Sequence, residues 1–180
     1  MKSSILIAFY LIFASTASWS AGLGIRTYSD PKSASDFSLP DLTGRIHEKS
    51  DYRDRAYIIS FWATWCVPCI KELPDLQRAA EILDEENITV LTVNSGETRE
   101  VIDQFLVQRS VTLPVLLDQD SNMLRQWRVL ALPTSYIVNA KGQIVARVVG
   151  GIDWDELSIL AHVRALAAAN QNDDSDRESN

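Results

Sequence analysis

An α/β fold is predicted, because buried strands alternate with helical patterns along the chain. Residues 57–62 are β-branched and aromatic enough for a buried strand, and a helical pattern follows from Pro68 onward. A second apolar run at residues 88–94 is again followed by a helical pattern, at residues 98–109. This alternation predicts a sandwich in which helices cover a central sheet.

The later segments complete the sheet. Residues 116–118 predict a further short strand, and residues 135–138 and 144–149, joined by the turn 139–142, predict an antiparallel hairpin. The helix at residues 98–109 is expected to bury one face, which consists of Val101, Ile102, Phe105 and Leu106.

A last helix is predicted to close the domain. Asp153 and Glu156 have the spacing of a capping box, and the helical pattern then runs to about residue 168. Its inward face is expected to consist of Leu157, Leu160 and Val163.

The composition fits one acidic domain. The 180 residues are 46% hydrophobic, with a net charge of −7 and a pI near 4.8. Without the two terminal segments about 150 residues remain, which is enough for a single core. An acidic surface argues against nucleic acid, whose phosphates require basic side chains. The partners are therefore expected to be proteins, and the chain a monomer.

Both ends are predicted to lie outside this domain. Lys2 precedes the apolar residues 5–13, and residues 18–20 end with small side chains of the kind that a signal peptidase recognises. Residues 1–20 are therefore expected to be a signal peptide, with an uncleaved membrane anchor as the alternative. Residues 169–180 are expected to form a disordered acidic tail.

The only two cysteines, Cys66 and Cys69, lie where a strand is followed by a helix. Unpaired backbone N–H groups and the positive end of the helix dipole favour the thiolate form of Cys66 there. Cys69 lies one turn further, where its sulfur can attack a mixed disulfide on Cys66. The pair predicts a redox-active dithiol with an attacking and a resolving cysteine.

Zinc binding, copper binding and a structural disulfide are the alternatives to redox exchange at the two cysteines. Zinc normally needs four ligands, and this chain has one Cys-x-x-Cys motif and two distant histidines. Two thiolates at this spacing can hold Cu(I), so a copper-handling chaperone is the alternative function. A purely structural disulfide is disfavoured, because so short a loop removes little entropy from the unfolded chain.

The segment around the cysteines resembles a known family. Trp65-Cys66-Val67-Pro68-Cys69, with Pro74 five residues later, is similar to a thioredoxin active site, and residues 65–73 resemble the TlpA/ResA-like branch of exported thiol-disulfide oxidoreductases. The resemblance covers residues 36–168. It implies a thioredoxin-like fold with an amino-terminal β-hairpin, begun by residues 36–44, and an inserted unit of one helix and one strand before the hairpin that closes the sheet.

The resemblance also implies roles for individual residues. Pro133 matches the proline whose peptide bond is cis in thioredoxin folds and which helps to hold a partner's backbone, with Leu132 beside it. Glu72 matches an acidic residue that tunes the proton affinity of the cysteines. The docking surface for a client is expected to include Trp62, Trp65 and Pro68.

Two departures from related proteins carry information. Ser60 occupies the position of the buried aspartate of thioredoxin, so proton transfer to the inner sulfur would use Glu72 or water. The Val67-Pro68 dipeptide lacks the histidine that strong oxidants of this fold carry. The disulfide is therefore expected to be comparatively stable, with a potential nearer thioredoxin's about −270 mV than DsbA's about −120 mV. A reductase is favoured over an oxidase.

The resemblance implies partners as well. The clients would be disulfide-containing proteins such as an apocytochrome c or a copper-site assembly protein, and a membrane thiol transporter would supply electrons in the periplasm. No cofactor is expected beyond the Cys66–Cys69 disulfide. His47 and His162 are expected to have surface roles, since neither lies beside the cysteines in the sequence.

Overall fold

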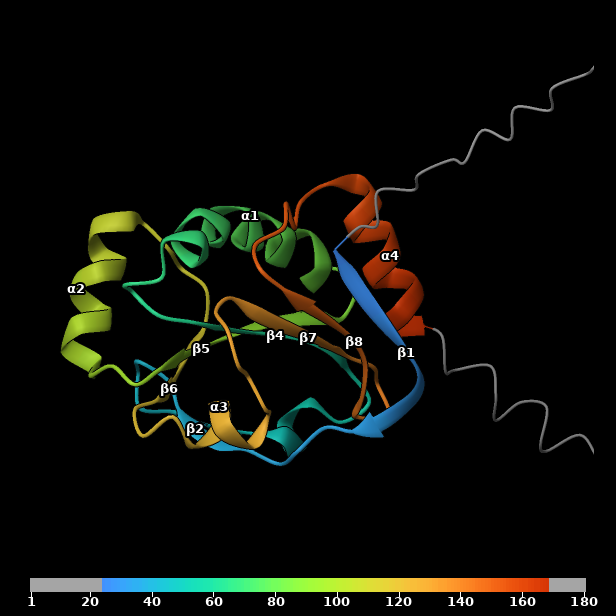
Figure 1. Cartoon of the computed structure of the whole chain (residues 1–180), viewed down its shortest axis with the longest axis horizontal. Coiled ribbons are helices and arrows are strands. Elements are labelled where there is room, and N and C mark those ends of the chain that lie inside the picture. Colours follow the sequence, from blue (N-terminus) through green and yellow to red (C-terminus); the bar gives the residue numbers. More distant parts are fainter. Residues whose placement is uncertain (1–23, 169–180) are drawn as a thin grey trace, which may run out of the picture.

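A computed structural model describes residues 24–168 of the protein. One six-stranded sheet is covered by helices on one face and by a small hairpin and short helices on the other (Figure 1). The elements are β1 (Ile25–Ser33), β2 (Ser38–Pro40), β3 (Ile46–Glu48), the 3-10 helix η1 (Lys49–Tyr52), β4 (Ala56–Trp62), α1 (Val67–Asp84), β5 (Ile88–Ser95), α2 (Arg99–Arg109), β6 (Val115–Asp118), α3 (Asn122–Gln126), β7 (Thr134–Val138), β8 (Gln143–Val149) and α4 (Leu157–Ala168).

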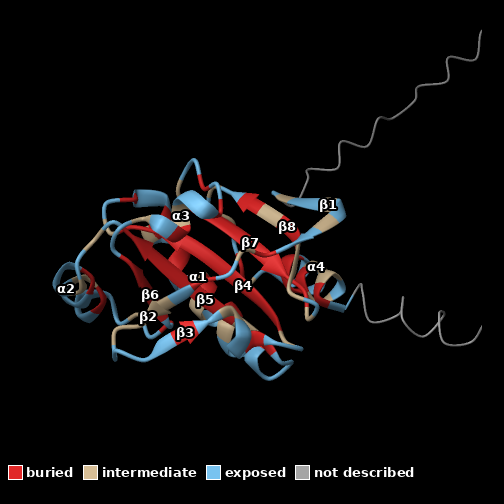
Figure 2. Cartoon of the chain, turned by 90° about the horizontal axis from the view of Figure 1, so that it is seen from below, coloured by how far each residue is buried: buried red, intermediate tan, exposed pale blue. Residues whose placement is uncertain are grey.

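The strands of the main sheet follow the order β1-β8-β7-β4-β5-β6. β4, β5 and β6 are parallel, whereas β7 is antiparallel to β4 and β8, and β1 is antiparallel to β8. All seven residues of β4 are buried, as its continuous apolar sequence predicts for a central strand covered on both faces. Figure 2 shows this buried interior along the central strands.

One face of the sheet carries the larger core. Because side chains alternate along a strand, Ile58 and Trp62 of β4 point to this face, where α1, α2 and α4 pack (Figure 1). Helix α1 buries an apolar stripe at helical spacing, which includes Leu73, Leu76, Ala79 and Leu83. This packing fixes the start of α1 against the end of β4.

The opposite face carries a second core that is rich in aromatic rings. Tyr57, Ile59 and Phe61 of β4 point to it, beneath the β2–β3 hairpin, η1 and α3. The hairpin pairs Leu39 with His47, which confirms the amino-terminal hairpin that the sequence predicted. The predicted inserted unit is α2 with β6, and β6 extends the sheet beyond β5.

Some local expectations were wrong. Leu157 was expected to face the core but is 81% exposed. A capping box from Asp153 to Glu156 would start the helix at residue 154, whereas α4 starts at Leu157, so Leu157 lies in the first turn of the helix. Ile159, Leu160 and Val163 form its buried side instead. Similarly, Val101 is exposed at the edge of the α2 face that buries Ile102.

The expectation of a surface role for His47 was also wrong. The ring is buried, with Nδ1 2.6 Å from the Tyr52 hydroxyl and Nε2 3.0 Å from Asp41 Oδ2. Hydrogen bonds from Thr43, His47 and Arg45 hold the pKa of Asp41 well below its usual range despite the opposing effect of burial. His47 thus joins the hairpin to η1, while His162 is half-buried on α4.

The predictions for the ends of the chain concern residues that are not described. The signal peptide or anchor at residues 1–20 and the tail at residues 169–180 both lie outside residues 24–168. β1 precedes residue 36, where the predicted domain starts, and pairs with β8 in the main sheet. Among the described helices, none is long and apolar enough to cross a membrane.

Candidate active site

Cys66 and Cys69 form a disulfide where β4 leads into α1. Cys66 is the N-cap residue of α1, and its Sγ accepts a hydrogen bond from the Cys69 backbone N–H at 3.3 Å. The Cys66 sulfur therefore faces the Cys69 amide donor at a helix N-terminus. These donors and the helix dipole stabilise negative charge on Cys66 when the disulfide is reduced.

The two cysteine residues differ slightly in exposure. Cys66 retains 5% of its surface exposed and Cys69 only 1%. Both residues belong to the core between α1 and the sheet, and Cys66 is the one nearer to solvent. Access thus agrees with Cys66 as the attacking and Cys69 as the resolving residue.

Pro133 lies beside this turn because β7 pairs with β4. The register places Thr134 opposite Phe61, close to the end of β4 from which the cysteine turn departs. The Leu132–Pro133 peptide bond is cis, as the resemblance implied, and the Pro133 carbonyl accepts a hydrogen bond from the Gly150 N–H at 2.9 Å. Leu132 is half-buried and Pro133 is buried.

The side chains that flank Cys66 form an exposed surface. Trp65 is 69% and Val67 is 61% exposed, and Pro68 is also exposed. Large apolar side chains that remain this exposed are typical of protein contact sites. Trp62 differs from the expectation, because it is 1% exposed and packs on Phe105 with ring centroids 5.6 Å apart. Its ring supports the site from within the core and does not face a client.

Glu72 is a buried carboxyl group one helical turn after Cys69. It is 5% exposed, and its Oε2 has no hydrogen bond of normal geometry with described residues. Burial raises its pKa from the ordinary 4.5 to about 7, against smaller opposing effects of the Trp154 indole, the Ile152 backbone and Ser60. At neutral pH this group can both accept and donate a proton.

The surroundings of Glu72 connect it with solvent. A pocket of about 230 Å³ extends from the surface to Glu72 between Lys71 and Asp153. Gly151 covers the carboxyl group so closely that a Cβ atom there would lie 3.2 Å from Glu72 Oε2. Beneath it, Ser60 accepts a hydrogen bond from the Ser135 hydroxyl at 2.8 Å. The Ser60 hydroxyl thus lies between Ser135 and Glu72, and its own O–H is directed at the Glu72 carboxyl group.

A second carboxylate holds the loop before Cys66, and sequence reasoning missed it. Glu97 Oε2 accepts hydrogen bonds from the Thr64 backbone N–H and from Asn94 Nδ2, each at 2.7 Å, and the Thr64 hydroxyl donates to Glu97 Oε1. Trp62 pairs with Asn94 in the register of β4 and β5. Parallel strands end at one edge of a sheet, so the polar residues that follow β5 were the available signal.

No group of three or more histidine, cysteine, aspartate or glutamate side chains is arranged for a metal ion within residues 24–168. Cys66 and Cys69 are the only cysteines of the chain, and their thiolates are soft ligands.

The chain is similar to known thiol-disulfide oxidoreductases. The AhpC/TSA family matches residues 31–147. The thiol-disulfide oxidoreductase ResA of Bacillus subtilis is 32% identical over 127 residues, which are 71% of each chain. The crystal structure of StoA from Bacillus subtilis superposes with a TM-score of 0.62 and 25% identity, over 71% of this chain and 96% of StoA.

A third relative is the exposed lipoprotein thioredoxin of Streptococcus pneumoniae. Its crystal structure has a TM-score of 0.61 and 30% identity, over 72% of this chain and 98% of that one. Together with the disulfide at the start of α1, these matches confirm the thioredoxin-like fold and the thiol-disulfide oxidoreductase activity that the sequence predicted. The chain belongs to the AhpC/TSA family and, within it, to the ResA-like thiol-disulfide oxidoreductases.

Proposed function

We propose that the protein is an exported reductase of disulfides in protein clients. The observation that carries this proposal is the position of Cys66, whose Sγ accepts the Cys69 amide hydrogen bond at the N-terminus of α1. This position lowers the energy of a Cys66 thiolate, which is the attacking species in disulfide exchange. The exposed Trp65 and Val67 offer a client an apolar contact surface around it.

The reaction starts from the reduced protein. The Cys66 thiolate attacks one sulfur of the client disulfide, the S–S bond of the client breaks, and its second sulfur leaves as a thiolate that takes a proton from solvent. Cys69, after losing its proton, attacks Cys66 Sγ and releases the other client sulfur as a thiolate. Two electrons pass from the cysteine pair to the client, which leaves the Cys66–Cys69 disulfide seen in the structure.

Glu72 accepts the proton of Cys69 in the second step. A carboxyl group with a pKa of about 7 matches the working pH of a general base, and the pocket beside Lys71 leads the proton to solvent. The cis Pro133 segment supports the client backbone next to the reacting sulfurs, with Leu132 exposed in part.

The direction of the reaction follows from the dipeptide between the cysteines. Val67 and Pro68 supply no imidazolium to stabilise the thiolate further, which keeps the disulfide comparatively stable and the reduced protein reducing. Export is supported by the apolar residues 5–13 and by the description of a structural neighbour as an exposed lipoprotein.

An exported reductase needs electrons in an oxidising compartment. A membrane thiol transporter supplies them to the Cys66–Cys69 disulfide, and the reduced protein then acts in cytochrome c maturation or cytochrome oxidase assembly. The clients are an apocytochrome c with a disulfide between its haem-binding cysteines or a copper-site assembly protein.

Trapping of the client tests this proposal. The Cys69→Ser variant should accumulate a mixed disulfide through Cys66 that mass spectrometry identifies, whereas Cys66→Ser should lose all turnover. Full activity of Cys66→Ser would overturn the mechanism. Tight Cu(I) binding at physiological metal levels, with no trapped client, would favour the copper-handling alternative.

A further inference from the structure

A basic pocket lies on the sheet face opposite α1, between β1, β8 and the loop after α3. It has a volume of about 570 Å³, and four cationic side chains line it: Arg26, Lys32, Arg128 and Arg147. The one acidic residue in its lining is Asp30. In Figure 2, α3, β8 and β1 follow one another along this side of the molecule. Such a cationic lining is unexpected in a chain with a net charge of −7.

The positive charges of the basic pocket are not neutralised within the described part of the chain. The side chains of Arg26, Lys32 and Arg128 form no ion pair or hydrogen bond with residues 24–168. Arg147 lies over the Tyr136 ring at 5.7 Å, and its Nε is buried without a hydrogen-bond partner among these residues. Trp127 also lines the pocket, and its buried Nε1 lacks a partner as well.

Two of the arginines face each other directly. Arg26 of β1 pairs with Arg147 of β8 in the sheet register, so their side chains leave the sheet on the same face. Like charges in directly opposite positions destabilise an antiparallel pair. The fold therefore keeps a destabilising arrangement, and an anion bound between the two strands would relieve it.

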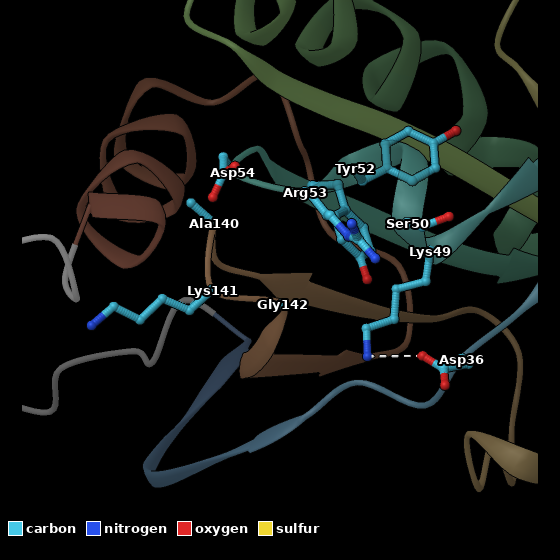
Figure 3. Close-up of a pocket in the computed structure, with 10 residues that line it drawn as sticks. Asp36, Lys49, Ser50, Tyr52, Arg53, Asp54, Ala140, Lys141 and Gly142 are labelled. Atoms are coloured by element: carbon cyan, nitrogen blue, oxygen red, sulfur yellow. Dashed lines mark ion pairs between the residues drawn. The ribbon is translucent and has the colours of Figure 1, made fainter.

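A different pocket of this protein contains an ion pair. In Figure 3, Lys49 pairs with Asp36 across a pocket of about 380 Å³, with Nζ and Oδ1 3.1 Å apart. Arg53, Asp54 and Lys141 are further charged residues in its lining. The cations of the basic pocket form no such ion pair with described residues, so their positive charge can attract an anionic group from solution.

The basic pocket is connected with the active site by a short loop. Arg128 and Pro133 are five residues apart, so they are separated by at most about 18 Å. A client chain that lies extended beside Pro133 would cover this distance with five or six residues. The intervening Leu130 is 89% exposed and offers such a chain an apolar contact.

We propose that the basic pocket binds an acidic segment of the protein client, which lies within about six residues of the cysteine that reacts with Cys66. This inference rests on the proposed reduction of protein disulfides and specifies the class of client. Because charges are screened beyond about 8 Å at physiological ionic strength, the local cations attract the segment although the whole protein is acidic. The pocket thus selects among clients, and the cysteines carry out the same exchange on each of them.

Two synthetic disulfide peptides test the proposal. Both contain the same two cysteines, and five residues away one carries three glutamates where the other carries three glutamines. The full-length protein, reduced beforehand, is mixed with each peptide, and tryptophan fluorescence gives the second-order rate constant of its oxidation. The acidic peptide should react about three-fold faster or more, and this ratio should fall toward one as salt is raised.

Variants test whether the basic pocket causes the faster reaction of the acidic peptide. The double variant Arg26→Gln/Arg128→Gln should lower the ratio to about one, leave the rate with the neutral peptide unchanged, and unfold at the same or a higher urea concentration. Arg53→Gln is the control for a positive charge removed elsewhere on the surface, because Arg53 lines the pocket of Figure 3, and this variant should keep the full ratio.

Three results would overturn the inference. Equal rates with both peptides would reject the acidic-client site while leaving the proposed reductase intact, whereas failure to reduce either peptide would reject the proposed function with it. The third result is an unchanged ratio in the double variant, accompanied by a loss of its binding to anionic phosphatidylglycerol vesicles relative to the full-length wild-type protein. This would assign the basic pocket to a membrane surface.

Discussion

Replacing Glu72 with glutamine removes a carboxyl group that burial makes hard to ionise. The folded protein raises the pKa of Glu72 from 4.5 to about 7. Each pKa unit corresponds to about 1.4 kcal/mol, so the shift corresponds to about 3 kcal/mol of lost stability once the group is ionised. Glutamine has nearly the same shape and cannot ionise, so it isolates this effect.

The sign follows from proton binding. Between pH 4.5 and about 7 the unfolded chain has lost the Glu72 proton while the folded protein still holds it. The free energy of unfolding of the wild-type protein therefore falls as pH rises through this window, and it levels off above the folded pKa. Relative to Glu72→Gln, the wild-type protein should lose about 3 kcal/mol between pH 4 and pH 8.

Urea unfolding of the oxidised protein, followed by tryptophan fluorescence across this pH range, measures the difference. Glu81→Gln is the control, because it removes one carboxyl group from an exposed position on the same helix. A difference between wild type and Glu72→Gln that changes by less than about 1 kcal/mol from pH 4 to pH 8 would refute the argument from burial.

Three further predictions concern the surroundings of the cysteines. Glu97→Gln should destabilise the protein by about 1–3 kcal/mol and lower kcat/KM, because it weakens the charge-assisted hydrogen bonds to the loop before Cys66. Urea unfolding measures the stability, and reduction of a disulfide peptide measures kcat/KM. Asp103→Asn, on the exposed side of α2, is the control and should change neither the stability nor kcat/KM. Gly151→Ala should lower the free energy of unfolding by about 1–2 kcal/mol, because the new Cβ would press on Glu72. Stopped-flow measurements should also show that the client is released more slowly from the mixed disulfide. An unchanged release rate would contradict a role of Glu72 in that step. Trp65→Ala should lower kcat/KM for a protein disulfide about ten-fold, while the free energy of unfolding stays within about 0.5 kcal/mol of the wild-type value, because Trp65 is exposed. A wild-type kcat/KM in this variant would show that Trp65 does not contact the client.

The central part of the fold could be predicted because its sequence patterns are strong. β4, β5 and β8 are apolar runs bounded by turns, and their observed bounds differ from the expected ones by one residue. β1 was missed, since an edge strand with one solvent-facing side shows no continuous apolar run, and its pairing with β8 is interrupted between Thr27 and Lys32.

The site was predictable where chemistry depends on neighbours along the chain. The thiolate environment of Cys66 needs only a helix start, which the sequence indicates directly. The network of Glu97 with Thr64 depends on two parallel strands that end at the same edge, a tertiary relation that spacing does not encode. The burial of Trp62 likewise depends on where α2 packs, because Phe105 of that helix covers the ring.

The equilibrium reduction potential of the Cys66/Cys69 couple tests the central claim most directly. The protein would be poised in buffers of defined thiol and disulfide ratio, with tryptophan fluorescence as the readout. A reductase with no imidazolium between its cysteines should have a potential near or below about −270 mV. A potential near about −120 mV would instead identify an oxidant and contradict the proposed direction of electron flow.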